Sequence, residues 1–220
     1  MSRRLTRPII CVVTRARGGS GAPERIALLD RLHTAAAAGA TMVQIRERQF
    51  GDRALASFVR DVIEATRPAG ALVTVNDRTD VALAAGADGV HLKSDGPDPL
   101  DVRRLVPPGF VVGRSVHTDE EAAAMAESGA CDYLLFGTVF PSRSKRSDHP
   151  IAGPDALARV CRRVTIPVVA IGGVSVERGA DIAGAGATGA AAISLFRDAQ
   201  DIGAVVRDLR DALTVRAGNV

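Results

Sequence analysis

The sequence predicts an α/β protein that forms a single (β/α)8 barrel, or TIM barrel, as one domain over residues 1–220. Eight short aliphatic runs recur along the chain, and a segment with helical periodicity follows each run. The runs are continuous rather than alternating, as is usual for strands buried on both faces of a parallel sheet. Eight such units in 220 residues are typical of the barrel. A doubly wound sheet is the alternative, because the sequence does not reveal strand order.

The expected strands are rich in Val, Ile and Leu. They cover residues 9–14, 41–46, 72–76, 89–92, 110–115, 132–137, 167–173 and 190–196. The chain has no Trp, one Tyr and six Phe, while 46% of its residues are hydrophobic. We therefore expect a core built mainly from Ala, Val, Ile and Leu.

Helical segments lie between these strands. They cover residues 24–40, 52–66, 79–87, 98–106, 118–130, 155–164, 177–187 and 201–213. The first reaches Gly39, a natural C-cap, and the second begins at Asp52, which we expect to be an N-cap, and stops before Pro68. The glycines in the segment 177–187 lower its helix propensity.

Charge and cysteine content exclude several classes of protein. The net charge is only +3 and the arginines are scattered, so no nucleic-acid partner is expected. No apolar segment approaches the ~20 residues needed to span a membrane, and the run at 9–13 is too short for a secretory signal. Cys11 and Cys131 lie in or beside apolar runs, without metal-binding spacing, and suit buried thiols. We therefore expect a cytoplasmic protein.

Polar residues follow the strands at the end where such barrels carry their chemistry. They are Thr14, Gln44, Arg46, Arg48, Asn76, Asp77, Arg78, His91, Lys93, Ser115 and His117. A polar rim on an aliphatic sheet is costly to desolvate, so a functional site explains it better than solvated loops of ordinary polarity.

Two sets of residues at the strand ends suit an anion. Gly172 and Gly173 end the seventh strand, and Ile193 and Ser194 come at the end of the eighth, where barrels usually bind phosphate through backbone amides. The alternative is a tight turn. The arginines of "QIRER" (44–48) suit a carboxylate or phosphate, unless Glu47 and surface acids pair with them.

His117 suits proton transfer near neutral pH, although a histidine can also merely cap a helix or fill a strand end. We expect His91 to be structural and assign no role to His33 or His149. Residues 141–150 form a basic loop that suits a mobile lid, with Lys145 delivering charge, or a disordered loop.

Several motifs together resemble the thiamin phosphate synthase superfamily. They are "VQIRER", "VNDRTDVALAAGADGVHL", "VGRSVHTDEEA", "DYLLFGTVFPSRSK", "PVVAIGGV" and "GATGAAAISLF", and the likeness runs from about residue 9 to 215. The resemblance implies a (β/α)8 barrel of thiamin biosynthesis with two branches. The synthase joins hydroxymethylpyrimidine diphosphate to a thiazole phosphate and releases pyrophosphate with Mg²⁺. The thiazole tautomerase (TenI-like) branch aromatises a carboxylated thiazole phosphate by moving a proton, without metal.

The two branches differ at positions that this sequence can be compared with. The synthase pattern Gln-x-Arg-x-Lys is matched by Gln44 and Arg46, while Arg48 replaces its lysine. Asn76 and Asp77 also match the synthase. Its second metal-binding aspartate falls on Gly96, with Asp95 one place early, and Lys93 replaces a glycine. Because losing an acidic ligand weakens magnesium binding, and because "GRSVH" and "LFGTVF" look closer to the other branch, we predict a tautomerase.

The resemblance then implies roles for the site residues. The phosphate arm docks on the Gly172, Gly173, Ile193 and Ser194 segment, His117 shuttles the proton and Ser115 orients it. The remaining substrate-binding residues are Gln44, Arg46, Arg48, Asn76, Asp77, Ser142, Ser144 and Lys145. No cofactor is expected in this reading.

Three alternatives stay open. One is thiamin phosphate synthase, with Mg²⁺ held by Asp77 and Asp95. Another is a non-catalytic phosphate-ligand binding protein. The third is a sugar-phosphate epimerase or isomerase, which needs an acid/base pair of which only one member is evident. The expected partner is a small-molecule thiazole phosphate, with no nucleic acid and no membrane, and a homo-oligomer is possible.

Overall fold

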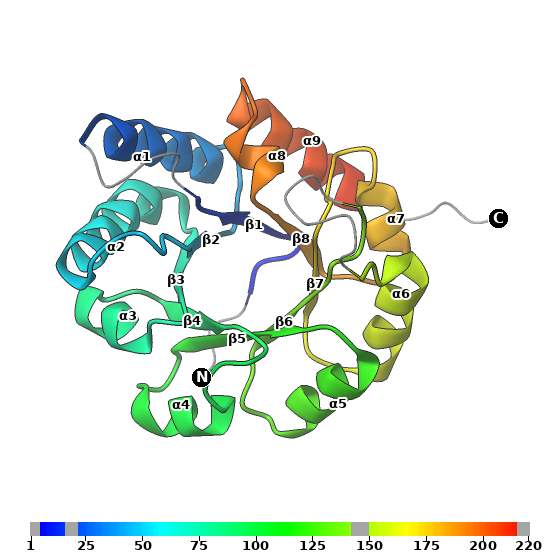
Figure 1. Ribbon diagram of the computed structural model, residues 1–220. Helices are drawn as coiled ribbons and strands as arrows, with labels where there is room; N and C mark the ends of the chain where they lie inside the picture. The colour runs from blue at the N-terminus through cyan, green and yellow to red at the C-terminus, as the bar shows by residue number, and fades with distance from the viewer. Residues whose placement is uncertain (1–4, 16–21, 142–149, 215–220) are drawn as a thin grey trace.

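A computed structural model of the chain describes residues 5–15, 22–141 and 150–214. Eight parallel strands close into a barrel in the order β1-β2-β3-β4-β5-β6-β7-β8, which confirms the predicted (β/α)8 fold and excludes the doubly wound sheet (Figure 1). The strands are β1 (Ile9–Val13), β2 (Met42–Ile45), β3 (Leu72–Asn76), β4 (Gly89–Leu92), β5 (Val111–Val116), β6 (Tyr133–Phe136), β7 (Val168–Ile171) and β8 (Gly189–Ala192).

Helices surround the barrel as an outer ring (Figure 1). They are α1 (Ala22–Ala37), α2 (Asp52–Thr66), the 3₁₀ turn η1 (Arg67–Ala69), α3 (Thr79–Ala85), α4 (Pro99–Leu105), α5 (Asp119–Glu127), α6 (Gly153–Arg163), α7 (Gly179–Gly184), α8 (Ser194–Arg197) and α9 (Ile202–Thr214). Within the described ranges, no helix has the length and apolar character to cross a membrane.

A predicted strand end and a predicted helix cap are wrong. The expected strand at 190–196 ends at Ala192, and its last residues form α8, whose Phe196 is fully buried. A short apolar run has no period that distinguishes a strand from a buried helical turn. The N-cap of α2 is Gly51 rather than Asp52, whose carboxylate instead accepts a hydrogen bond of 2.6 Å from Arg78.

The barrel interior changes from apolar to polar along its axis. Its apolar part contains Ile9, Cys11, Val13, Met42, Val111, Tyr133, Leu135, Val169 and Ala191. Side chains two residues apart on a strand point the same way, so Gln44 follows Met42 into the interior. His91 and Ser115 follow Gly89 and Gly113 in the same manner. The carboxyl end of the barrel therefore receives polar side chains above an aliphatic base.

The cysteines behave as the sequence predicts. Cys11 and Cys131 are free and buried, and Cys161 is partly buried. Burial raises the pKa of the Cys11 thiol to about 12 and that of Cys131 to about 11. Both thiols therefore stay protonated and act as small apolar side chains.

Candidate active site

A cavity of about 490 Å³ opens at the carboxyl ends of the strands. Most of the predicted site residues lie in its wall. They are Gln44, Arg46, Arg48, Asn76, Ser115, His117, Gly172, Gly173, Ile193 and Ser194. His91, Lys93, Ser94 and Asp95 line it as well. The strand ends thus bring together residues that lie up to 150 positions apart in the sequence.

The floor of the cavity carries a buried polar chain. His91 Nε2 lies 2.8 Å from Ser115 Oγ, and its Nδ1 lies 3.1 Å from the Tyr133 hydroxyl. Gly113 makes room for this arrangement, because a Cβ there would lie 2.2 Å from Tyr133 Cζ. Burial lowers the pKa of His91 to about 3 and raises that of Tyr133, so both rings are uncharged at neutral pH. The floor is therefore polar but neutral.

Gln44 adds an unused donor to this floor. Its side chain is 2% exposed and lines the cavity. Gln44 Nε2 and Thr74 Oγ1 are buried without a hydrogen-bond partner among the described residues. Interactions with the side chains of Thr74 and Gln44 oppose the rise in the pKa of Tyr133. An unsatisfied buried donor costs about 1–3 kcal/mol, which makes Gln44 available to a bound molecule.

One side of the cavity is cationic. The backbone of Arg46 is held in place because its N–H donates to Thr14 Oγ1 at 3.0 Å. Partial burial lowers the pKa of the Arg46 guanidinium, and the nearby charges of Arg48 and Arg15 lower it further. Within the described part of the chain, neither Arg46 nor Arg48 forms a salt bridge. Positive groups that repel one another in this way are stabilised by an anion between them.

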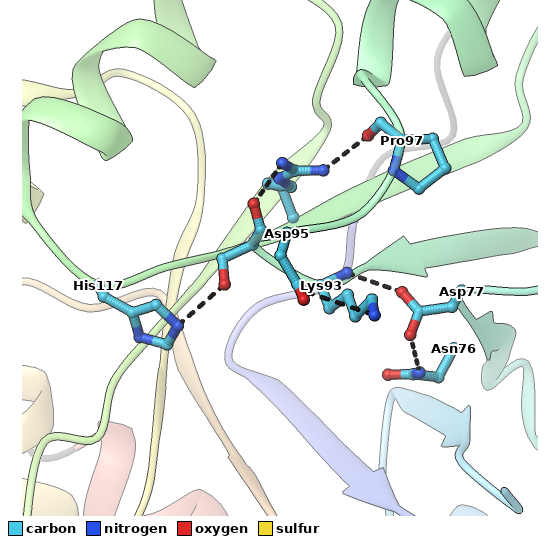
Figure 2. Close-up of polar contacts among 8 residues, drawn as sticks. Asn76, Asp77, Lys93, Asp95, Pro97 and His117 are labelled. Carbon is cyan, nitrogen blue, oxygen red and sulfur yellow. Dashed lines mark hydrogen bonds and ion pairs between the residues drawn. The ribbon is translucent and has the colours of Figure 1, made fainter. Parts of the chain in front are cut away.

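Asn76 and Asp77 form a fixed polar corner at the end of β3. Asp77 has a φ of 61°, and Arg78 N–H donates to Asn76 O at 2.8 Å, which closes a γ-turn of the rare form with positive φ. Asp77 Oδ2 accepts from Asn76 Nδ2 at 2.8 Å, and Oδ1 accepts from Lys93 N–H at 2.9 Å (Figure 2). A non-glycine residue held in this conformation costs about 1–3 kcal/mol and is typical of functional sites.

The loop after β4 is held by the side chain of Arg114. Its two terminal nitrogens donate to Ser94 O and Pro97 O, each at 2.7 Å (Figure 2). The loop begins with a turn in which Gly96 N–H donates to Lys93 O at 2.9 Å. Sequence reasoning did not identify Arg114, although it lies beside Ser115 in "GRSVH". Its position in the β5 sequence does not predict that its side chain contacts the loop after β4.

His117 connects three loops at the rim. Its Nε2 lies 3.2 Å from Ser94 Oγ (Figure 2). Its Nδ1 lies 2.5 Å from Gly137 O, and its backbone N–H donates to Glu121 Oε2 at 2.7 Å. A carbonyl oxygen can only accept, so Nδ1 carries the proton and Nε2 faces Ser94. Ser115 was expected to orient this ring, but it contacts His91 instead, and Ser94 takes that place.

The ends of β7 and β8 form a glycine-lined corner. Gly172 and Gly173 have φ values of 95° and 63°. A Cβ on Gly173 would lie 2.4 Å from Pro141 O, so only glycine fits there. For the backbone N–H groups of Gly173, Ile193 and Ser194, no acceptor is found among the residues that the structure describes. These amides are free to bind an anion at the cavity wall.

Some predicted residues lie elsewhere. Ser142, Ser144, Lys145 and His149 fall outside the described residues. His33 is on α1, where its Nδ1 lies 2.9 Å from Ala65 O, away from the cavity. Among the described side chains, no group of three or more His, Cys, Asp or Glu residues could hold a metal ion. Of the two acids predicted for a cation, Asp95 lines the cavity, whereas Asp77 lies beside it at the end of β3 and is not part of the wall.

Comparisons with known proteins agree with this geometry. A family model described as thiamine monophosphate synthase matches residues 11–196. The thiamine-phosphate synthase of Methanoculleus marisnigri is 42% identical over 184 residues, which are 84% of this chain and 87% of that protein. That of Chlorobium luteolum is 36% identical over 212 residues, 96% of each chain. The structure of thiamine phosphate pyrophosphorylase from Pyrococcus furiosus is similar with a TM-score of 0.81 and 31% identity, covering 93% of this chain and 95% of that one.

These relatives overturn the expected thiazole tautomerase. The expectation depended on Gly96 in a metal-binding position and on His117 as a proton shuttle. Relatives that are 36–42% identical nevertheless carry the name of synthases. The geometry also argues against the tautomerase reading, because Ser115 contacts His91 at the cavity floor and does not orient His117. The resemblance to the superfamily itself is confirmed.

Proposed function

Because the chain belongs to the thiamine monophosphate synthase family, we propose that it is a thiamin phosphate synthase. In this reaction hydroxymethylpyrimidine diphosphate is joined to a thiazole phosphate and pyrophosphate leaves. The substrates combine uncharged heterocycles with strongly anionic arms. One observation supports the proposal most directly, namely a neutral polar floor and a cationic rim within a single cavity.

The floor suits the pyrimidine ring. His91 and Tyr133 are uncharged at neutral pH, so they support the hydroxyl of Ser115 at the floor without attracting a counter-ion. Gln44 has a buried donor without a partner among the described residues, which a ring nitrogen of the substrate would satisfy. Ser115 is fixed by His91 at 2.8 Å and presents its hydroxyl to the same space. These residues therefore orient the ring so that its diphosphate arm points to the rim.

The two anionic arms have separate places at the rim. The amides of Gly173, Ile193 and Ser194 suit the single phosphate of the thiazole, with Gly172 shaping the turn. At the end of β2, Arg46 and Arg48 suit the diphosphate, and Asn76 at the end of the neighbouring β3 completes that wall. Binding both arms in one cavity holds the two rings next to each other, which replaces a bimolecular encounter by a positioned reaction.

Magnesium fits this site with one protein carboxylate. Protein-bound Mg²⁺ is usually held by one or two carboxylates together with substrate phosphates. Asp77 is held at the end of β3 by Asn76 and Lys93 and is the residue that would hold the ion, while Asp95 lines the cavity from the separate loop after β4. When bound, the ion neutralises charge on the departing pyrophosphate. Position 96 has no side chain to contribute.

The remaining predicted roles stay predictions. His117 has its proton on Nδ1 and fixes the loop at Ser94, which suits a positioning role at the rim. Substrate binding by Ser142, Ser144 and Lys145 is part of the proposal through the likeness to the family alone. The single-domain organisation and a homo-oligomer also stay predictions.

Growth complementation tests the proposed function. A bacterial strain that lacks its own thiamin phosphate synthase needs added thiamin, and expression of this chain should restore growth without it. The Arg46→Ala variant should fail to do so, while Arg60→Ala on the outer face of α2 should succeed. Failure of the unaltered chain, present as folded protein in the cells, would refute the proposal.

A further inference from the structure

Lys93 places a third cationic side chain in the cavity that Arg46 and Arg48 also line. Its Nζ lies 3.5 Å from Asp95 Oδ1 (Figure 2). The side chains of this pair are 48% and 78% exposed, and ion pairs so open to solvent are weak. The ammonium can therefore exchange Asp95 for a bound anion with little loss. Asp95 is the one acid among the described residues that line the cavity.

The backbone of Lys93 is fixed although its side chain is not. Its N–H donates to Asp77 Oδ1 at 2.9 Å, and its carbonyl accepts from Gly96 N–H at 2.9 Å. Arg114 holds the carbonyl of the next residue, Ser94, at 2.7 Å. These three contacts fix the backbone from which the Lys93 side chain extends, next to Asp77. A flexible cation on a fixed base can follow a diphosphate without disordering the loop.

Gly96 keeps the space for this lysine. A Cβ built on Gly96 would lie 3.1 Å from Lys93 O and 3.4 Å from Lys93 Cγ. A carboxylate side chain at position 96 would therefore crowd Lys93. The chain has a lysine at position 93 and a glycine at position 96. It therefore lacks a potential metal-binding carboxylate at position 96 and has a positively charged side chain at position 93 instead.

From these contacts we propose that the ammonium of Lys93 binds the diphosphate arm directly and takes over part of the charge neutralisation that magnesium would otherwise provide. The proposal rests on the proposed function, because it assigns the diphosphate to this corner of the cavity. Its consequence is that the chain binds a diphosphate measurably in the absence of divalent cations, and that Lys93 carries this binding.

Calorimetric titration of the full chain with inorganic pyrophosphate, once with chelator and once with Mg²⁺, tests the proposal. The unaltered chain should bind in chelator within about tenfold of its affinity in Mg²⁺. A charged hydrogen bond accounts for tenfold or more in affinity, so Lys93→Gln should widen this ratio to roughly a hundredfold. Lys93→Arg should retain binding in chelator, and Arg60→Gln, which removes a charge from the outer face of α2, should change nothing.

A double variant tests the link between the two positions. Lys93→Gly combined with Gly96→Asp removes the Cγ contact and adds a carboxylate, so pyrophosphate binding should then require Mg²⁺. The proposal is overturned if the unaltered chain binds pyrophosphate only with Mg²⁺, or if Lys93→Gln weakens binding equally in both buffers. Either result alongside formation of thiamin phosphate would leave the proposed function standing. Binding in chelator through Lys93 without any thiamin phosphate formation would refute that function alone.

Discussion

The carboxylate of Asp77 accepts a hydrogen bond of 2.9 Å from the backbone N–H of Lys93, which ties the end of β3 to the end of β4. The same carboxylate accepts from Asn76 Nδ2 at 2.8 Å. Asp77 makes both contacts with a φ of 61°. A strained residue thus sets the geometry of the corner where we place the diphosphate.

Asp77→Asn should separate catalysis from stability. Asparagine tolerates positive φ as well as aspartate does, and its Oδ1 can still accept from Lys93 N–H. Its Nδ2 then replaces the oxygen that accepts from Asn76, and Asn76 can turn its side-chain amide so that its own oxygen accepts instead. We therefore expect the free energy of unfolding in urea to change by less than about 1 kcal/mol, while kcat/KM for thiamin phosphate formation falls by about 10²-fold through loss of the charge. An equal kcat/KM in the variant would exclude Asp77 from the site.

Gly173→Ala should weaken binding of the thiazole phosphate. The new Cβ would meet Pro141 O at 2.4 Å, so the turn and its amide must move. We expect KM for the thiazole phosphate to rise more than KM for the pyrimidine diphosphate, with a loss of about 1–3 kcal/mol in unfolding free energy. Gly129→Ala is the matched control, because Gly129 has a φ of 66° but no atom within 4 Å of its Cβ position. If both variants have the same KM values, this corner does not bind the phosphate.

Buried His91 should make the protein less stable in acid. Its pKa is about 3 in the folded chain, below its value of 6.5 when unfolded. The unfolded state therefore binds the extra proton, and folding stability is lost as the pH falls from about 6.5 towards 3, by at most ~1.4 kcal/mol per pH unit. Urea unfolding between pH 4.5 and 7.5 should show a smaller slope for His91→Gln. Parallel pH dependences would mean that His91 protonates freely in the folded state.

Arg114→Lys should loosen the loop after β4. The guanidinium donates to two carbonyls at once, at 2.7 Å each, which an ammonium on a flexible stem cannot reproduce. We expect a loss of about 1–2 kcal/mol in unfolding free energy and a higher KM for the pyrimidine diphosphate. The control is Arg104→Lys, since Arg104 pairs with Asp101 on the exposed side of α4. A KM that is unchanged by Arg114→Lys would show that this loop does not bind the diphosphate.

Much of the fold could be predicted because the buried strands read as continuous aliphatic runs. The bounds of β3, β4 and α2 agree with the expected ranges 72–76, 89–92 and 52–66. The end of β8 could not be predicted, since "ISLF" is equally apolar as a strand or as the helical turn α8. Phe196 is buried in the hydrophobic cluster formed by strand and helix residues. This burial favours the helical turn, and it depends on residues that are distant in the sequence.

The candidate site was predictable only in part. Strand-end position identified Gln44, Arg46 and Asp77 because the carboxyl ends of barrel strands converge. Tyr133 was missed, because a tyrosine that starts an apolar strand looks like core until His91 is seen to contact its hydroxyl. Arg114 was missed because its partners are backbone carbonyls, which leave no trace in sequence spacing. The choice of branch was wrong because it depended on the identity of single residues at the rim.

The formation of thiamin phosphate by the purified chain tests the central claim most directly. The protein is mixed with hydroxymethylpyrimidine diphosphate, thiazole phosphate and Mg²⁺, and both products are measured over time. A synthase should release pyrophosphate and form thiamin phosphate in equal amounts, and it should release no pyrophosphate when thiazole phosphate is left out. Folded protein that binds both substrates and forms no thiamin phosphate would contradict the account.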